Sequence, residues 1–262
     1  MKFNNSAALI SVIKRGGRLP DYIIIGAQRG GTTSLFHYLS ENPSVSSPSK
    51  KELHFFSENY EKGLPWYRNR FPSNRNTITG ESTPYYLFHP LCAERIAKDL
   101  PNVRLIVMLR NPVTRAYSNY WLQVKQGHEP LSFEDAIKAE EKRTAGEEEK
   151  ILRDGNYNSI LHRSHSYLAR GVYVIQLERY FKYFERQKML ILKSEDFYND
   201  PITAAKKTFE FLGLPTNDLK LIRRHNAIDY PKMNPETRQK LIEYFRPYNE
   251  KLYSLLGVDF EW

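Results

Sequence analysis

Short, unbroken runs of apolar residues recur along the chain and alternate with longer amphipathic stretches. Clear runs occupy residues 22–26, 105–109 and 189–192, and a weaker one occupies 77–80. Runs of this kind are typical of strands buried on both faces of a parallel sheet. The amphipathic stretches predict helices at residues 33–40, 87–100, 112–126, 174–186 and 201–212. This alternation predicts an α/β fold, a doubly wound parallel sheet flanked by helices, with ligands at the carboxyl ends of the strands.

A last helix is expected near the C-terminal end of the sequence. Asn234 is a suitable N-cap, Pro235 suits the first helical position, and Gly257 suits the position after the helix. Pro247 lies inside this stretch and predicts a kink. The core-facing stripe of the helix is formed by Leu241, Phe245, Leu252 and Leu255.

Length and composition agree with a single α/β domain. The chain has 262 residues, of which 40% are hydrophobic, enough for a sizeable core. We expect an N-terminal extension over residues 1–20 and one domain over residues 21–262. The apolar runs are far shorter than the roughly 20 residues of a bilayer span, and no signal-peptide core is visible, so we expect a cytoplasmic protein without a membrane span. A single cysteine, Cys92, excludes an internal disulfide and a thiolate zinc cluster.

The charge balance narrows the partners to anionic ones. Lysine and arginine exceed aspartate and glutamate, which gives a formal net charge of +9. A positive body suits a nucleotide, an acidic glycan or a nucleic acid, and charge alone does not choose among them.

The first predicted strand runs into a loop rich in glycine and hydroxyl side chains. Glycines allow a tight turn that presents successive N–H groups to an anion, and the next helix adds the positive end of its dipole. An ordinary glycine-rich turn is the alternative, which the three hydroxyl residues and the arginine make less favoured. The residues predicted to bind phosphate are Gln28, Arg29, Gly30, Gly31, Thr32, Thr33 and Ser34.

This loop is P-loop-like but lacks one residue of the ATP-binding pattern. Gly26 and Gly31 have the spacing of G-x-x-x-x-G-K-[ST], whereas Thr32 stands where the lysine should be. A loop without that lysine is poorly suited to β- and γ-phosphates and magnesium. Arg29 could instead reach the bridging oxygen of a shorter 5′-diester-like group.

A second anion-binding candidate follows the apolar run at residues 105–109. Arg110 comes directly after this run, and Asn111 and Pro112 suit the start of the next helix, on which Ser118 lies. An arginine at a strand end and a serine on the adjoining helix can converge on a phosphate. From these residues alone, a surface salt bridge or a helix cap is an equally good interpretation.

A third motif holds two candidates for a general base. It reads Lys-Lys-Glu-Leu-His-Phe-Phe over residues 50–56, and its candidates are Glu52 and His54. In an extended segment these side chains face the same side, so both could line one pocket and take a proton from an acceptor. A solvated charged turn followed by an aromatic core anchor is the alternative, and the residues alone favour it.

Together the three motifs resemble those of the sulfotransferases that use 3′-phosphoadenosine-5′-phosphosulfate (PAPS), especially heparan sulfate sulfotransferases and their bacterial relatives. The resemblance spans nearly the whole chain. It implies that the loop containing Arg29 binds the 5′-phosphosulfate. It also implies that Arg110 and Ser118 bind the 3′-phosphate. Glu52 is the implied base, and His54 is the second candidate.

The resemblance implies a reaction and leaves the acceptor open. A sulfuryl group would move from PAPS to a hydroxyl or amine of a glycan or small natural-product acceptor, and adenosine 3′,5′-bisphosphate would leave. Many family members carry lysine at the position of Arg29, so we expect this arginine to stabilise charge on the leaving phosphate instead of donating a proton. Heparan sulfate enzymes often carry a C-terminal Lys-Gly-Arg loop that is absent here, and its candidate substitutes are Arg223, Arg224 and Lys232.

Two rival functions remain. A P-loop kinase-like phosphotransferase would turn over ATP with magnesium, and the missing loop lysine argues against it. A non-catalytic binder of acidic glycan or nucleic acid would use the net charge, and the base motif argues against it. We therefore expect no nucleic-acid partner and no metal, with His162 and His165 on a helix surface, and the oligomeric state stays open. Aromatic residues that could form an acceptor wall are Trp66, Tyr67, Tyr85, Tyr86 and Trp121.

Overall fold

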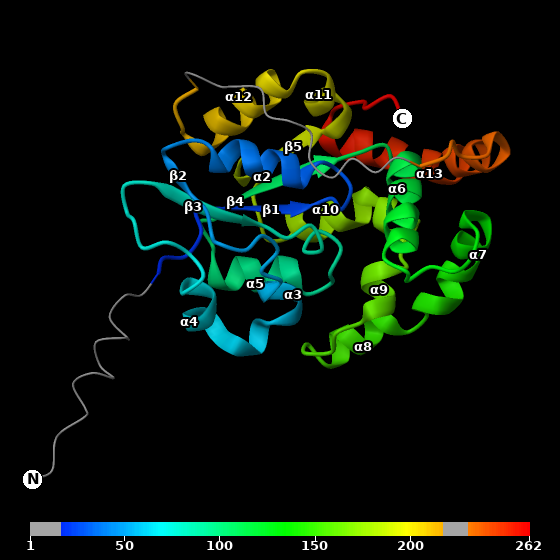
Figure 1. The fold of residues 1–262 in the computed structure, drawn as a ribbon, viewed down its shortest axis with the longest axis horizontal. Coiled ribbons are helices and arrows are strands. Elements are labelled where there is room, and N and C mark those ends of the chain that lie inside the picture. The colour runs from blue at the N-terminus through cyan, green and yellow to red at the C-terminus, as the bar shows by residue number, and fades with distance from the viewer. Residues whose placement is uncertain (1–16, 217–229) are drawn as a thin grey trace, which may run out of the picture.

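The computed structural model describes residues 17–216 and 230–262, which form one domain built on a five-stranded parallel sheet (Figure 1). The order of the strands across the sheet is β2-β3-β1-β4-β5. This confirms the predicted doubly wound α/β fold. The strands are β1 (Tyr22–Gly26), β2 (Val45–Ser46), β3 (Ile78–Ser82), β4 (Arg104–Leu109) and β5 (Met189–Lys193).

The four predicted strands are present, and the sequence did not indicate β2. This strand has only two residues, in which Val45 pairs with Ile78 and Ser46 pairs with Thr79 of β3. Two residues are too few to show an apolar run or an alternation, so only the pairing with β3 defines the strand.

Helices cover both faces of the sheet (Figure 1). The larger ones are α2 (Thr32–Ser40), α5 (Cys92–Asp99), α6 (Pro112–Lys125), α7 (Phe133–Thr144), α10 (Tyr173–Phe181), α12 (Pro201–Leu212) and α13 (Pro235–Leu256). Shorter ones are α3 (Phe55–Glu58), α4 (Gly63–Arg68), α8 (Glu147–Arg153), α9 (Ile160–Ser164) and α11 (Ser194–Asn199), with 3₁₀ turns at Tyr60–Lys62, Ala169–Gly171 and Arg186–Lys188.

The predicted helix ends hold where a cap defines them. The Asn111 side chain accepts hydrogen bonds from the backbone N–H groups of Val113 and Thr114 at the start of α6, and Asn234 caps α13 in the same way. The helix expected over residues 87–100 begins only at Cys92, because Pro90 cannot continue a helix that starts before it. Helix α13 runs on as one helix through Pro247.

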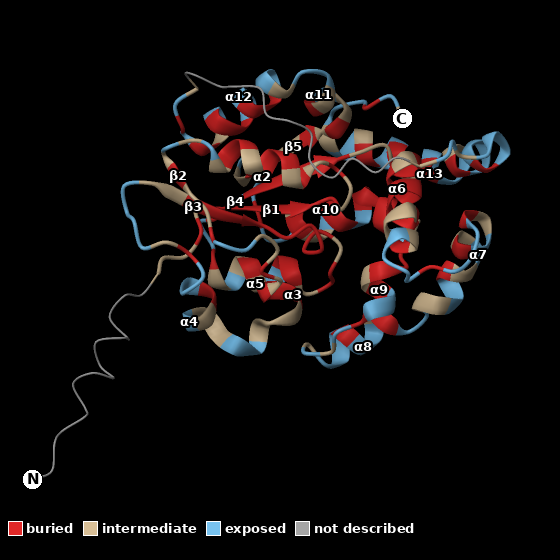
Figure 2. Cartoon of the chain, viewed as in Figure 1, coloured by how far each residue is buried: buried red, intermediate tan, exposed pale blue. Residues whose placement is uncertain are grey.

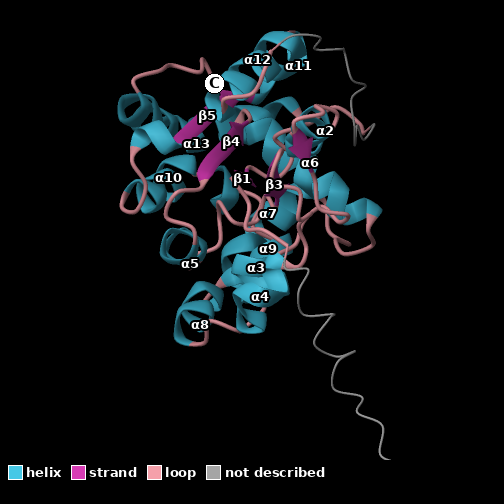
Figure 3. Ribbon diagram, turned by 90° about the vertical axis from the view of Figure 1, so that its left-hand side faces the viewer, coloured by secondary structure: helices cyan, strands magenta, loops and turns pink. Residues whose placement is uncertain are grey.

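The side chains of β1 and β4 alternate between two apolar layers. Ile23 and Leu105 pack on the face covered by α5, α10 and α13, whereas Ile24 and Ile106 pack on the face covered by α2 and α12. Figure 2 shows buried residues along the sheet and along the helix faces that meet it, and Figure 3 shows the layers from the side. Burial on both faces explains the continuous apolar runs in the sequence.

The sheet topology creates a crevice between β1 and β4. After β1 the chain turns through α2 toward β2 and β3, whereas after β3 it returns through α5 to β4 on the other side of β1. The connections that leave β1 and β4 therefore diverge at the carboxyl ends of these adjacent strands. Such a switch point is where open parallel sheets bind ligands. Within the described residues, no helix combines the length and the apolar character that crossing a bilayer demands.

Candidate functional site

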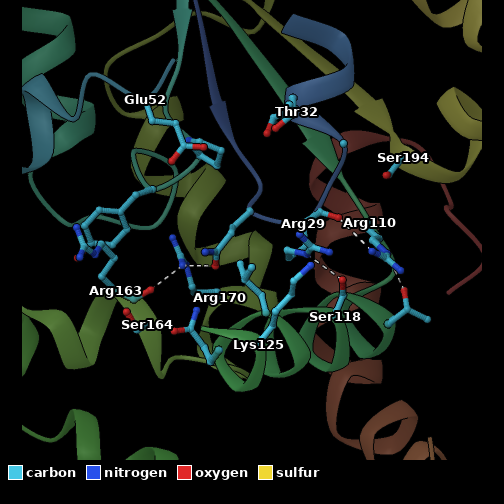
Figure 4. A pocket seen from close by; sticks show the side chains of 18 of the residues that line it. Arg29, Thr32, Glu52, Arg110, Ser118, Lys125, Arg163, Ser164, Arg170 and Ser194 are labelled. Carbon is cyan, nitrogen blue, oxygen red and sulfur yellow. Dashed lines mark hydrogen bonds between the residues drawn. The ribbon is translucent and has the colours of Figure 1, made fainter. Parts of the chain in front are cut away.

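A cavity of about 1200 Å³ opens at this switch point (Figure 4). Among the described residues that line it, five are arginine or lysine and two are glutamate, so the cavity suits an anion. Of the residues predicted from the sequence, Gly30 and Ser34 do not line the cavity. The predicted residues that do line it are Gln28, Arg29, Gly31, Thr32, Thr33, Glu52, His54, Arg110 and Ser118.

Close packing explains the glycine pair in the first loop. A Cβ atom on Gly30 would lie 2.4 Å from the carbonyl oxygen of Met108 in β4, a distance that no side chain tolerates. Gly31 has a φ of 95°, in the left-handed region that favours glycine, and it directly precedes α2. The pair lets the loop pass against β4 and turn the N-terminal end of α2 toward the cavity, where Thr32 and Thr33 lie.

Arg29 joins the loop to the second predicted phosphate site. Its Nε donates a 2.9 Å hydrogen bond to Ser118 Oγ, and its carbonyl oxygen accepts a 3.2 Å hydrogen bond from Nη1 of Arg110 (Figure 4). Burial and the adjacent positive charge of Arg110 lower the pKa of Arg29. The positive charges of Arg29 and Arg110 therefore lie next to each other in a partly buried part of the cavity. An anion bound between them would relieve their repulsion.

The end of β4 and the first turns of α6 fix Arg110 and Ser118. Arg110 Nε donates a 3.1 Å hydrogen bond to Thr114 Oγ1, and its carbonyl oxygen accepts a 2.8 Å hydrogen bond from the hydroxyl of Tyr173. Ser118 is buried on α6 and faces Arg29. The strand end and the helix thus bring together the arginine and serine that the sequence places eight residues apart.

Glu52 lies on the opposite side of the cavity from Arg110 and has close polar neighbours (Figure 4). Its carboxylate is 2.7 Å from Lys51 Nζ and 3.5 Å from His54 Nε2. Burial alone would raise the pKa of Glu52, but the hydrogen bond with His54 and the charge of Lys51 outweigh it and lower this pKa to about 2. Glu52 is therefore a carboxylate at any physiological pH.

His54 connects Glu52 to a second carboxylate. Its Nδ1 lies 3.4 Å from Glu58 Oε1, which also forms a 2.5 Å ion pair with Arg163 of α9. The two ring nitrogens of His54 therefore face Glu52 on one side and Glu58 on the other. Since Nε2 donates a hydrogen bond to Glu52, this order of groups suits a histidine that orients the Glu52 carboxylate.

The backbone at this site is unusual at three positions. Arg29, Glu52 and His54 have φ values of 68°, 63° and 51°, in the left-handed region that side chains other than glycine rarely adopt. Such conformations carry a cost of the order of 1–3 kcal/mol each and concentrate at functional sites. All three are residues that the sequence motifs had singled out.

Arg170 is a site residue that the sequence analysis missed. It is 3% exposed, lines the cavity, and donates hydrogen bonds from Nη1 to Gln28 Oε1 and to the carbonyl oxygen of Arg163. Its guanidinium lies 5.1 Å from the ring centre of Tyr85. Burial and the charge of Arg115 lower the pKa of Arg170 to about 9. No local motif marks this residue, since long-range packing brings it to the cavity.

The histidine prediction was wrong. His162 and His165 are 3% and 9% exposed, not surface residues. His162 stacks on Phe88 with ring centres 4.3 Å apart, and its Nδ1 lies 2.9 Å from the Tyr85 hydroxyl. Burial lowers the pKa of His162 to about 3. These contacts come from segments distant in sequence, which a helical pattern cannot show.

Of the five aromatic residues considered for an acceptor wall, only Tyr85 lines the cavity. Tyr67 and Tyr86 are fully buried beside β3, and Trp121 stacks on Tyr230 with an interplanar angle of 2°. Trp66 packs against the core. Most of the proposed wall is therefore core.

The candidate substitutes for the C-terminal Lys-Gly-Arg loop were Arg223, Arg224 and Lys232. Arg223 and Arg224 lie outside the described residues, and Lys232 is exposed. Over residues 17–216 and 230–262, no group of three or more histidine, cysteine, aspartate or glutamate side chains is arranged to hold a metal ion.

Comparison with known proteins agrees with this geometry. Residues 19–251 match the family model described as "Sulfotransferase domain". The membrane-associated sulfotransferase kil1 of Dictyostelium discoideum is 29% identical over 93% of this chain, and the human heparan sulfate glucosamine 3-O-sulfotransferase 3B1 is 30% identical over 94%. The matches cover 66% and 65% of these two relatives, slightly less than two thirds of their length.

A solved structure shows the same fold. The sulfotransferase from Alicyclobacillus acidocaldarius superposes with a TM-score of 0.75 at 30% sequence identity, over 92% of this chain and 97% of that chain. The match to the family model covers most of the chain, and the relatives and the solved structure point the same way. The chain therefore belongs to the sulfotransferase family.

Proposed function

We propose that this protein transfers a sulfuryl group from PAPS to a hydroxyl or amine of a glycan or small-molecule acceptor. The observation that carries the proposal is that one cavity holds Arg29 and Arg110, in direct contact, together with the carboxylate of Glu52. Two arginines suit the two ends of a nucleotide that carries phosphate at both its 3′- and 5′-positions. A carboxylate in the same cavity suits an acceptor that must lose a proton.

The chain's own residues fit such a nucleotide. Arg110 and Ser118 would bind the 3′-phosphate, a group that ATP lacks. Arg29, Thr32 and the N-terminal end of α2 would bind the 5′-phosphosulfate. Because Gly30 has no Cβ atom and Gly31 adopts a positive φ, the loop backbone can lie close against β4. The space for the 5′-phosphosulfate therefore stays open.

When bound, PAPS supplies the sulfuryl group and leaves as adenosine 3′,5′-bisphosphate. Arg29 stabilises the negative charge that develops on the departing 5′-phosphate. Glu52 takes the proton from the acceptor oxygen or nitrogen as the new bond to sulfur forms. A carboxylate with a pKa of about 2 is a weak base, so Glu52 acts through its position in the cavity, which the hydrogen bond from His54, 3.5 Å away, maintains.

The cationic lining favours an acceptor that carries negative charge. Lys125 and Arg170 line the cavity in addition to the arginines assigned to the nucleotide. The names of several relatives specify heparan sulfate, which is a glycan, as the acceptor. An acidic glycan is therefore the acceptor class we propose to test first.

The proposal is tested with PAPS labelled with ³⁵S and a panel of acidic glycans, neutral glycans and small hydroxylated compounds. We expect label to move to at least one acceptor without added divalent metal. Glu52→Gln should reduce this transfer by about 10²–10⁴-fold while adenosine 3′,5′-bisphosphate still binds. Transfer of phosphate from ATP with magnesium, and none from PAPS, would favour the rival kinase.

A further inference from the structure

A buried carboxyl group, Glu81, lies directly behind the segment that carries Glu52. It sits in β3, is 0% exposed, and does not line the cavity. Its Oε1 accepts hydrogen bonds from the hydroxyls of Tyr67, at 2.6 Å, and Tyr86, at 3.0 Å. Its Oε2 accepts a 2.6 Å hydrogen bond from Thr83 Oγ1. A polar residue in the middle of a buried strand is costly, so its hydrogen bonds need an explanation.

Two of these hydroxyls also contact the base-bearing segment. The backbone N–H of His54 donates a 3.4 Å hydrogen bond to Thr83 Oγ1, and the backbone N–H of Phe56 donates a 3.4 Å hydrogen bond to the Tyr86 hydroxyl. A backbone N–H can only donate, so both hydroxyl oxygens accept there and must direct their hydrogens elsewhere. Glu81 is the acceptor for both hydrogens. The carboxylate thereby sets which way each hydroxyl presents its lone pairs to the segment.

The segment needs such support because its backbone is strained. Glu52 and His54 both have positive φ values, which persist only where the surroundings over-determine them. The backbone N–H of Glu52 also donates a 3.2 Å hydrogen bond to the carbonyl oxygen of Ser82. Three anchors from the end of β3 and the residues just after it thus hold residues 52–56, and two of them depend on hydroxyls that Glu81 orients.

We propose that Glu81 is a positioning residue for the general base: acting through Thr83 and Tyr86, it holds residues 52–56 so that Glu52 points into the cavity beside His54. It touches no substrate. This inference rests on the proposed function, because it assigns Glu81 a part in the work of Glu52.

Glu81→Gln tests the inference with almost no change in volume. An amide has one acceptor oxygen and one donor nitrogen, whereas all the neighbours of Glu81 named above donate to it. The amide nitrogen would face either Thr83 or the two tyrosine hydroxyls. In either orientation at least one hydroxyl must turn, and the anchor to His54 or to Phe56 weakens.

Three further variants separate positioning from general packing. Thr83→Val removes the hydroxyl that joins Glu81 to the His54 N–H, and Thr83→Ser keeps that hydroxyl. Tyr67→Phe is the matched control. The Tyr67 hydroxyl bonds to Glu81, whereas the Tyr67 ring, which the variant keeps, packs on Phe55 and Phe56 of the segment. A purely structural role for the network would make Tyr67→Phe as harmful as Glu81→Gln.

The first readout is kinetic. Glu81→Gln and Thr83→Val should lower kcat by about ten- to a hundredfold, as expected when a reacting group is misplaced. The Kd for adenosine 3′,5′-bisphosphate should stay within about twofold of the wild-type value, because the nucleotide residues lie on other elements. Thr83→Ser and Tyr67→Phe should retain nearly the wild-type kcat.

The second readout does not need turnover. A ¹³C NMR titration of the Glu52 carboxyl should show its pKa rising in Glu81→Gln and Thr83→Val, because Glu52 loses its alignment with His54. The other charged or titratable groups near Glu52 are Lys51, His54, Glu58 through His54, and Arg170, and every variant retains them. Glu81 also interacts with His54, and Thr83→Val, which keeps Glu81, separates the loss of its charge from the loss of alignment.

Each result bears on a different claim. An unchanged kcat and an unchanged Glu52 titration in Glu81→Gln would overturn the inference, as would an equal loss in Tyr67→Phe. If the wild-type protein transfers no sulfuryl group, the proposed function fails. In that case a shifted Glu52 titration in Glu81→Gln and Thr83→Val still supports the positioning contact, and an unshifted one rejects it.

Discussion

Arg29 and Ser118 are 89 residues apart in the sequence, yet Nε of Arg29 donates a 2.9 Å hydrogen bond to Ser118 Oγ. This contact couples the loop after β1 to helix α6, so the two predicted phosphate sites form one continuous surface. Arg29, which is predicted to bind the 5′-end of the nucleotide, is thereby held by Ser118, which is predicted to bind the 3′-end. Changes at either position should be felt at both ends of the nucleotide.

Substitution of Arg29 tests its role on the leaving group. Arg29→Lys keeps the positive charge and should retain turnover within about tenfold, whereas Arg29→Ala should lower kcat by about 10²–10³-fold, the usual cost of removing a group that stabilises developing charge. Steady-state assays with PAPS give both values. Wild-type turnover in Arg29→Ala would remove Arg29 from the mechanism.

Arg110 should be specific for the 3′-phosphate. Arg110→Ala removes charge-assisted hydrogen bonds of about 1.5–3 kcal/mol, so the Kd for adenosine 3′,5′-bisphosphate should rise by about 10–150-fold. Affinity for AMP, which lacks the 3′-phosphate, should change little. Isothermal titration calorimetry measures both. Lys182→Ala is a suitable control, because Lys182 is exposed and does not line the cavity. Equal losses for the two nucleotides would contradict the assignment.

The acid limb of the pH–rate profile should report on Lys51. Glu52 has a lowered pKa, about 2 against an ordinary 4.5, so it stays ionised until the pH falls close to that value. Lys51→Met removes a neighbouring positive charge and should raise the pKa of Glu52 toward its ordinary value. Activity should then decline at a higher pH than in the wild type. The rise should be partial, because the hydrogen bond from His54 also lowers this pKa and stays in place in the variant.

Rates measured across acidic buffers, with checks that the fold is intact at each pH, give this comparison. An acid limb that stays in place in Lys51→Met would mean that Lys51 does not act on the base.

The backbone at Glu52 should reveal a conflict between stability and function. Glu52→Ala and Glu52→Gly both remove the carboxylate, but only glycine adopts a φ of 63° without a steric cost. We therefore expect Glu52→Gly to have a free energy of unfolding about 1 kcal/mol higher than Glu52→Ala. Urea denaturation of the two variants measures the difference. A more stable alanine variant would show that the segment is not strained.

The sequence predicted those parts of the molecule that local pattern determines. The strands β1 and β4 are continuous apolar runs because both faces are buried, and the caps at Asn111 and Asn234 are visible in the sequence. Residues that long-range packing brings to their place were not predicted. Arg170 reaches Gln28 over 142 residues, and no pattern near Arg170 indicates it.

Burial also explains why the prediction that His162 and His165 lie on a helix surface was wrong. His162 has neighbours of mixed polarity in the sequence, but stacking on Phe88 and contact with Tyr85 remove it from solvent. The sequence motifs did not indicate a role for Glu81. Its role depends on the hydroxyls of Thr83 and Tyr86, and a sequence pattern does not show which way a hydroxyl points.

The strands β1 and β4 lie in the centre of the sheet and should be the last part of the molecule to unfold. Each has a strand on both sides, and both are covered by helices on either face, so their amide hydrogens should exchange with deuterated solvent only when the whole domain unfolds. The loops that hold Arg29 and Arg110 start from these two strands. Arg29 and Arg110 therefore follow the strands whose amide hydrogens should exchange most slowly, whereas Glu52 follows the two-residue edge strand β2.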